Sequence, residues 1–221
     1  MPIAYDAASN SGYQTASTYS WATHRTTGSN LLLLVGVSML SVAGSSVSSI
    51  TYDGNALSLV RVRTSATGTI RVEIWKLVAP ATGVKTIAVT LSAALDSIAS
   101  ASTFTGVDQT TPTEADNDNS ATNGIDAADA TVDVTTIADN DWVFDCVATD
   151  DTAITVGAGQ TSRTNVTGTL GSGATSTEGP KTPAGVVTMS WTDIAALQTW
   201  TTVGVAVRPV DVTTLGSQIC L

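Results

Sequence analysis

The sequence predicts an all-β protein, folded as a two-sheet antiparallel β-sandwich of the jelly-roll type. Its 221 residues are rich in Thr, Ser, Val, Ala and Gly and poor in Lys, Glu and Gln, a composition of strand and turn formers. The segment 31–38 is apolar on both faces and too short to cross a bilayer. About ten to twelve short apolar runs recur along the chain with turn signals between them.

The run 31–38 predicts a buried central strand, with Leu33 and Val35 on one face and Leu32 and Leu34 on the other. Because both faces are apolar, a layer must cover each of them. The remaining strands are predicted to supply these two layers.

The other elements follow from local patterns in chain order. The polar segment 13–24 predicts an exposed or edge strand. Asp53-Gly54 predicts a tight hairpin between 47–52 and 56–63, because this turn needs positive φ at both central residues. Further strands are expected at 69–78, 84–92, 97–105, 131–137, 142–149, 154–163, 186–191 and 199–208. In the last one, Gly204 and Ala206 predict the close approach of a neighbouring layer.

Residues 1–209 are predicted to form a single domain, with 210–221 as a C-terminal tail or arm. Within this domain the apolar pattern disappears over 113–130, where Glu114 and several Asp residues follow one another. We expect a long acidic loop there. The number of strands exceeds that of an immunoglobulin domain, which favours the jelly roll.

Charge and targeting signals exclude several classes of function. The net charge is −10, and the nine basic residues are scattered, so neither nucleic acid nor an anionic membrane is an expected partner. Residues 1–6 show no signal-peptide features, which predicts synthesis in the cytoplasm without export. Cys146 and Cys220 do not form a disulfide framework and are expected to be free thiols.

No catalytic constellation is evident. His24 is the only histidine and is interpreted as a surface residue, so histidine metal clusters are excluded. Glu73 and Asp145 lie in different predicted strands, and nothing pairs them as glycosidase carboxylates, so each is interpreted as part of a solvated face. We therefore expect no enzyme and no cofactor.

Two binding sites remain candidates. Asp116, Asp118 and Asp126 offer oxygen ligands for calcium, but Ser120 and Ala121 break the EF-hand spacing, so an acidic loop without an ion is favoured. Tyr19, Trp21 and Trp191 have polar neighbours and are candidate glycan contacts, although core or sheet-edge packing is the commoner use of such side chains.

Three phrases carry a family resemblance. Residues 49–57 read Ser-Ile-Thr-Tyr-Asp-Gly-Asn-Ala-Leu, residues 72–80 Val-Glu-Ile-Trp-Lys-Leu-Val-Ala-Pro, and residues 104–112 Phe-Thr-Gly-Val-Asp-Gln-Thr-Thr-Pro. The chain from about residue 13 to 209 resembles a β-sandwich domain of bacterial surface or secreted proteins and of tailed-phage virion proteins. These phrases are strand and turn signatures, and the resemblance implies no catalytic residues.

The resemblance and the missing signal peptide together predict a structural protein of a tailed-phage virion. The expected form is a capsid decoration (cement) protein or a head or tail fibre subunit, assembled as a homo-oligomer such as a trimer and bound to major capsid or other virion proteins. The alternative is a carbohydrate-binding module of a cell-surface protein or phage adhesin, with host glycan as its partner.

Overall fold

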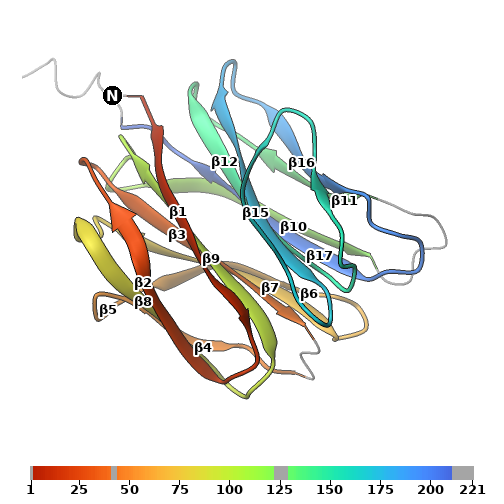
Figure 1. Ribbon diagram of the computed structural model, residues 1–221. Helices are drawn as coiled ribbons and strands as arrows, with labels where there is room; N and C mark the ends of the chain where they lie inside the picture. Colours follow the sequence, from red (N-terminus) through yellow and green to blue (C-terminus); the bar gives the residue numbers. More distant parts are fainter. Residues whose placement is uncertain (1, 41–43, 122–128, 211–221) are drawn as a thin grey trace, which may run out of the picture.

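The computed structural model describes residues 2–40, 44–121 and 129–210, which form β-strands and no helix. The strands make four antiparallel sheets stacked as successive layers (Figure 1). The all-β, antiparallel, jelly-roll-like sandwich is thus confirmed, with four sheets where two were predicted. None of the described residues belongs to a helix that could cross a membrane.

The first half of the chain supplies a larger and a smaller sheet. The larger has the order β1-β9-β3-β7-β6 and the smaller β2-β8-β4-β5. The strands are β1 (Ala4–Gln14), β2 (Thr18–Thr26), β3 (Leu32–Leu40), β4 (Val47–Tyr52), β5 (Asn55–Ala56), β6 (Ser58–Thr64), β7 (Ile70–Val78), β8 (Gly83–Leu91) and β9 (Asp96–Thr105).

The second half repeats this arrangement. Its larger sheet has the order β10-β17-β12-β15-β14 and its smaller sheet β11-β16-β13. The strands are β10 (Thr113–Ala121), β11 (Ala130–Thr135), β12 (Asp141–Thr149), β13 (Thr155–Val156), β14 (Thr161–Thr167), β15 (Ser172–Lys181), β16 (Val186–Thr192) and β17 (Trp200–Val207).

The strand pairing in each half is that of a jelly roll. In the first half β1 pairs with β9, β2 with β8 and β3 with β7, while in the second β10 pairs with β17, β11 with β16 and β12 with β15. Replacing β1, β9, β3, β7 and β6 by β10, β17, β12, β15 and β14 converts one larger sheet into the other without a change of order. The chain therefore contains the same jelly roll twice in tandem.

Local details support this internal repeat. Asp53 N donates to Thr86 O over 2.9 Å, and Gly157 N donates to Ser190 O over the same distance at the equivalent place. Two pairs of short segments are also similar in sequence. Residues 80–84 are Pro-Ala-Thr-Gly-Val, and residues 183–186 are Pro-Ala-Gly-Val. Residues 107–111 are Val-Asp-Gln-Thr-Thr, and residues 210–214 are Val-Asp-Val-Thr-Thr. Such short matches, spaced about half a chain apart, are a weak signal of repetition.

The two larger sheets pack face to face on a central core. Leu32 and Leu34 of β3 meet Phe144 and Cys146 of β12 there. Each larger sheet also packs on its own smaller sheet, which gives one outer core in the first half and a pair of apolar clusters in the second. The two jelly rolls stand side by side in Figure 1, the first coloured red to yellow-green and the second green to blue.

Several predicted elements are confirmed. β3 is the middle strand of its sheet and is buried along its length, with Leu33 and Val35 in the first outer core. Asp53 and Gly54 have φ values of 51° and 80° and join β4 to β5. A Cβ atom on Gly204 would lie 2.6 Å from Val134 Cγ2, the close approach that was expected.

Three strands were not predicted from the sequence. Residues 113–121 of the predicted acidic loop form β10, because the polar side chains of this strand find partners on both faces. Two strands have no counterpart among the predicted ones: residues 172–181 form β15 in the interior of its sheet, and residues 4–14 form β1. The rest of the predicted loop, 122–128, lies outside the described residues, as does the tail from residue 211.

Candidate functional site

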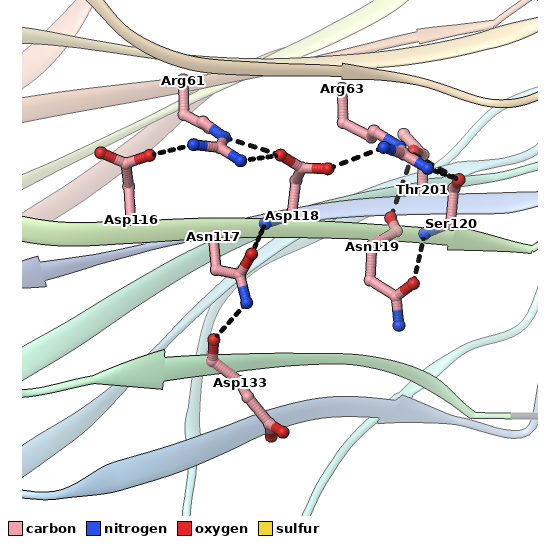
Figure 2. A network of polar contacts seen from close by, with 9 residues as sticks. All are labelled: Arg61, Arg63, Asp116, Asn117, Asp118, Asn119, Ser120, Asp133 and Thr201. Carbon is pink, nitrogen blue, oxygen red and sulfur yellow. Dashed lines mark hydrogen bonds and ion pairs between the residues drawn. The ribbon is translucent and has the colours of Figure 1, made fainter.

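Strand β10 carries a network of polar side chains that joins the two halves (Figure 2). Arg61 donates from Nη1 to Asp116 Oδ1 over 2.8 Å and from Nε to Asp118 Oδ2 over 2.6 Å. Arg63 lies 3.1 Å from Asp118 Oδ1 and donates to Ser120 Oγ over 3.0 Å. The hydrogen bond with Asp118 is the main cause that raises the pKa of Arg61. Because side chains alternate along a strand, every second residue of β10 faces these arginines.

The intervening residues of β10 face the smaller sheet of the second half. Asn117 Nδ2 donates to the backbone oxygen of Asp133 over 2.8 Å, and Asn119 Nδ2 donates to that of Thr131 over 2.9 Å. Figure 2 shows the arginine contacts on one side of the strand and the contact of Asn117 with Asp133 on the other. Strand β10 thus connects three sheets through side chains.

Two of the three calcium candidates belong to this network. The carboxylates of Asp116 and Asp118 accept hydrogen bonds from guanidinium groups, and Asp126 lies outside the described residues. The ranges 2–40, 44–121 and 129–210 contain no group of three or more His, Cys, Asp or Glu side chains arranged to hold a metal ion.

The candidate glycan-contact aromatics do not form one surface. Trp191 is fully buried in the second half, where its Nε1 donates to Asp145 Oδ2 over 2.8 Å, so it packs in a core and is not a glycan contact. Tyr19 and Trp21 are half-buried against the outer core of the first half. Trp21 Nε1 donates to Ser9 Oγ over 2.8 Å, and burial raises the pKa of Tyr19 to about 12. The long apolar bodies of these rings fill cores, which the polar residues beside them in the sequence did not reveal.

His24 is buried, which corrects its interpretation as a surface residue. Its Nδ1 lies 2.9 Å from Ser9 Oγ and its Nε2 lies 2.5 Å from Thr103 Oγ1, so each ring nitrogen has a hydroxyl group as its hydrogen-bond partner. Burial lowers the pKa of His24 to about 4, so the ring is neutral at pH 7. The side chain is a structural link between β2, β1 and β9.

Glu73 and Asp145 are also buried, so their interpretation as solvated charges is wrong. Glu73 accepts hydrogen bonds from Arg71 Nε over 2.7 Å and Trp75 Nε1 over 2.9 Å. Asp145 accepts from the backbone nitrogen of Ser176 over 2.9 Å and from its hydroxyl over 2.6 Å, besides Trp191. Burial raises the pKa of Asp145 to about 7. Val72 and Ile74 beside Glu73, and Phe144 and Cys146 beside Asp145, face the central core, so the two carboxyl groups point away from it on opposite sides. They therefore do not form a glycosidase pair.

A further buried acidic pair was not found from the sequence. Glu114 on β10 has a side chain that is 4% exposed, and its Oε1 lies 3.1 Å from Arg208 Nε. Asp141 at the start of β12 accepts hydrogen bonds from the backbone nitrogens of Ile137 and Ala138, both over 3.0 Å. One oxygen of each, Glu114 Oε2 and Asp141 Oδ1, is buried without a hydrogen-bond partner. Burial and the neighbouring Asp141 raise the pKa of Glu114. Glu114 and Asp141 lie on different strands that are far apart in the sequence, so no local sequence pattern predicts the pair.

An open cavity of about 380 Å³ lies between the halves, at the ends of β3 and β12. Leu40 and Ile70 line it from the first half, and Asp150, Leu170 and Thr199 from the second. The acidic group there, Asp150, already accepts a hydrogen bond from Thr199 N over 2.7 Å. The described lining therefore does not show the several convergent polar groups of a typical ligand site.

Comparisons with known proteins add little to this description. No family model matches the sequence, and no curated protein matches it. Among solved structures, one described as the STIV MCP has a TM-score of 0.30 and 8% identity, covering 98% of this chain and 100% of that one. Dimeric latent PorU from Porphyromonas gingivalis also has a TM-score of 0.30, with 10% identity, covering 91% of this chain and 20% of PorU. Likenesses this distant carry no argument about function.

Proposed function

We propose that the chain is a non-enzymatic structural protein that acts through protein–protein contacts. The observation that carries this proposal is that the groups with potential chemistry are used internally. His24, Glu73 and Asp145 are buried and hydrogen-bonded, and Asp116 and Asp118 are paired with arginines. Jelly rolls are common architectures of viral capsid and lectin domains, which supports such a role at the level of the fold.

In its specific form, the proposal is a tailed-phage virion protein, either a capsid decoration protein or a head or tail fibre subunit. It would be made in the host cytoplasm, assemble as a homo-oligomer such as a trimer, and bind major capsid or other virion proteins. The resemblance of residues 13–209 to virion β-sandwich domains supports this form. A net charge of −10 without basic clusters supports protein rather than nucleic acid as the partner.

Apolar side chains on the surface offer a place for such contacts. Ile137 and Val186 are each 66% exposed. Thr135 pairs with Val186 in the smaller sheet of the second half, so both apolar groups lie at the same end of this sheet. Exposed apolar residues close together are typical of a protein interface.

The test combines mass and binding. Light scattering of the purified chain is expected to show a discrete oligomer, and co-sedimentation with assembled phage shells is expected to show saturable binding. The double variant Ile137→Asp with Val186→Asp should lose the shell binding, while Val84→Asp, at the equivalent place in the first half, serves as the matched control. A monomeric chain that does not bind shells would overturn the proposal.

Glycan binding rested on exposed aromatics. Because Trp191 is buried, and Tyr19 and Trp21 pack inward, the structure leaves this alternative without a specific supporting observation.

A further inference from the structure

The two halves pack through two equivalent seams at opposite edges of the central core. At one edge β6 of the first half packs on β10 of the second, and at the other β14 of the second half packs on β1 of the first. The repeat relates β6 to β14 and β10 to β1. Exchanging the halves therefore exchanges the seams, as in a symmetric dimer whose two subunits are joined into one chain.

The β6–β10 seam, which we call the charged seam, is held by arginines and carboxylates. Arg61 and Arg63 project from β6, and Asp116 and Asp118 project from β10 to meet them (Figure 2). The carboxylate of Asp118 is only 10% exposed, so its charge is largely removed from water and depends on the two arginines.

The β14–β1 seam, which we call the aromatic seam, has different chemistry. Arg163 on β14 stacks over the ring of Tyr5 on β1, with its Cζ 3.4 Å from the ring centroid. The ring of Tyr13 lies against Gly168, where an added Cβ would come within 1.8 Å of Cδ2 of the tyrosine. Strand β1 thus presents rings at the seam where β10 presents carboxylates.

This difference has a consequence for pairing between chains. If the first halves of two chains packed together, β6 would meet β1, and Arg61 and Arg63 would lose Asp116 and Asp118. If two second halves packed together, Asp116 and Asp118 would face β14. The one basic residue of β14 is Arg163, which stacks on Tyr5 at the aromatic seam. Because each chain carries one half of each kind, such like-with-like pairing would join chains into dimers or into longer open polymers.

We propose that the charged seam selects the pairing partner of each inner sheet: it directs the first half onto the second half and rejects the pairing of like halves between chains. Charged groups fix partner choice because a wrong partner leaves like charges or unpaired charges facing each other. This selection is independent of whether the chain serves in a virion.

The experiment uses the full chain and measures its mass against concentration by light scattering. The double variant Arg61→Asp with Arg63→Asp places four carboxylates in the charged seam, and their repulsion weakens the pairing of the first half with the second half. Pairing between two first halves no longer leaves arginines without partners, so its cost falls. Its mass is expected to rise with concentration to about twice the wild-type mass or more, as pairing between chains begins. Adding Asp116→Arg and Asp118→Arg reverses both sides and should restore the wild-type mass and most of the melting temperature.

A matched control is the double variant Arg25→Asp with Lys85→Asp, which makes the same change of charge at the exposed β2–β8 pair and breaks the ion pair of Lys85 with Asp53. It should keep the wild-type mass. The proposal is overturned if Arg61→Asp with Arg63→Asp keeps the mass and melting temperature of this control. If that variant does not fold, the four-site variant decides: a soluble protein of wild-type mass supports the proposal, and an aggregated one overturns it.

Discussion

Gly36 on β3 lies directly against Cys146 on β12, so that a Cβ atom on Gly36 would come within 2.6 Å of the sulfur atom. The contact joins the middle strands of the two larger sheets across the central core. Burial raises the pKa of Cys146 to about 12, so the group at this contact is an uncharged thiol. The distance between the two jelly rolls is set here by the absence of a side chain.

The first prediction concerns this contact. Gly36→Ala should lower the free energy of unfolding by about 1–3 kcal/mol, the usual cost of overpacking a core, because β12 is buried and hydrogen-bonded to a strand on each side. Urea unfolding measures it. Gly36→Ala with Cys146→Ala should recover part of the loss, and Gly185→Ala, where an added Cβ meets nothing within 4 Å, should change little. Equal stability of Gly36→Ala and Gly185→Ala would contradict the prediction.

The second prediction concerns Asp145 and pH. Its folded pKa of about 7 lies above its usual value, so the folded state binds the proton more tightly. The resulting stability is fully present below the unfolded pKa and is lost as the pH rises from about 4 through 7. Asp145→Asn should therefore flatten the fall in melting temperature between pH 5 and pH 8.5. The exposed Asp193→Asn is the control, and an unchanged slope in Asp145→Asn would show that the carboxyl is not responsible.

The third prediction concerns Glu114 and Asp141. Burial raises the pKa of Glu114, which favours its protonated form in the folded state. This form can donate a hydrogen bond to Asp141 and stabilises the fold. The stabilisation is lost as the pH rises through the raised pKa. Glu114→Gln keeps a donor and should remove part of the pH dependence. Glu114→Ala leaves the buried Asp141 without that donor and should melt at a lower temperature at pH values below the raised pKa of Glu114. If the glutamine and alanine variants melt alike, the hydrogen bond between the two carboxyl groups is absent.

The fourth prediction concerns calcium. Because Asp116 and Asp118 are neutralised by Arg61 and Arg63, removing calcium with a chelator should leave the melting temperature unchanged. Differential scanning fluorimetry with and without added calcium measures this, with magnesium as the control for ionic strength. A rise in melting temperature with calcium alone would assign an ion to the protein.

The sequence predicted the strands that bury a regular apolar pattern. β3 was found because Leu32, Leu33 and Leu34 are apolar on both faces, and the β4–β5 hairpin was found because Asp53-Gly54 suits only a tight turn. Both predictions depend only on neighbouring residues in the sequence, so they do not require knowledge of the partners of the segment in the fold.

The elements that were missed depend on distant partners. Asp116 and Asp118 look like loop residues until β6 brings Arg61 and Arg63 opposite them. His24 looks exposed because its neighbours are polar, yet Ser9 and Thr103 satisfy its ring inside the sandwich. The sequence does not reveal the repeat, because its two copies have the same strand order but few identical residues.

The last prediction follows from the shared central core. Val72 and Ile74 of the first half pack in one cluster with Val203 and Val205 of the second, so neither larger sheet keeps its apolar inner face covered without the other. We therefore expect residues 1–209 to unfold as one cooperative unit, in line with the single domain predicted from the sequence. In calorimetry the measured enthalpy should equal the van't Hoff enthalpy. The control is Val134→Ala, which sits in the outer core of the second half: it should shift the whole transition rather than split it. Two resolved transitions, with only one moved by Val134→Ala, would mean that each jelly roll is stable by itself and that the central core adds association rather than folding.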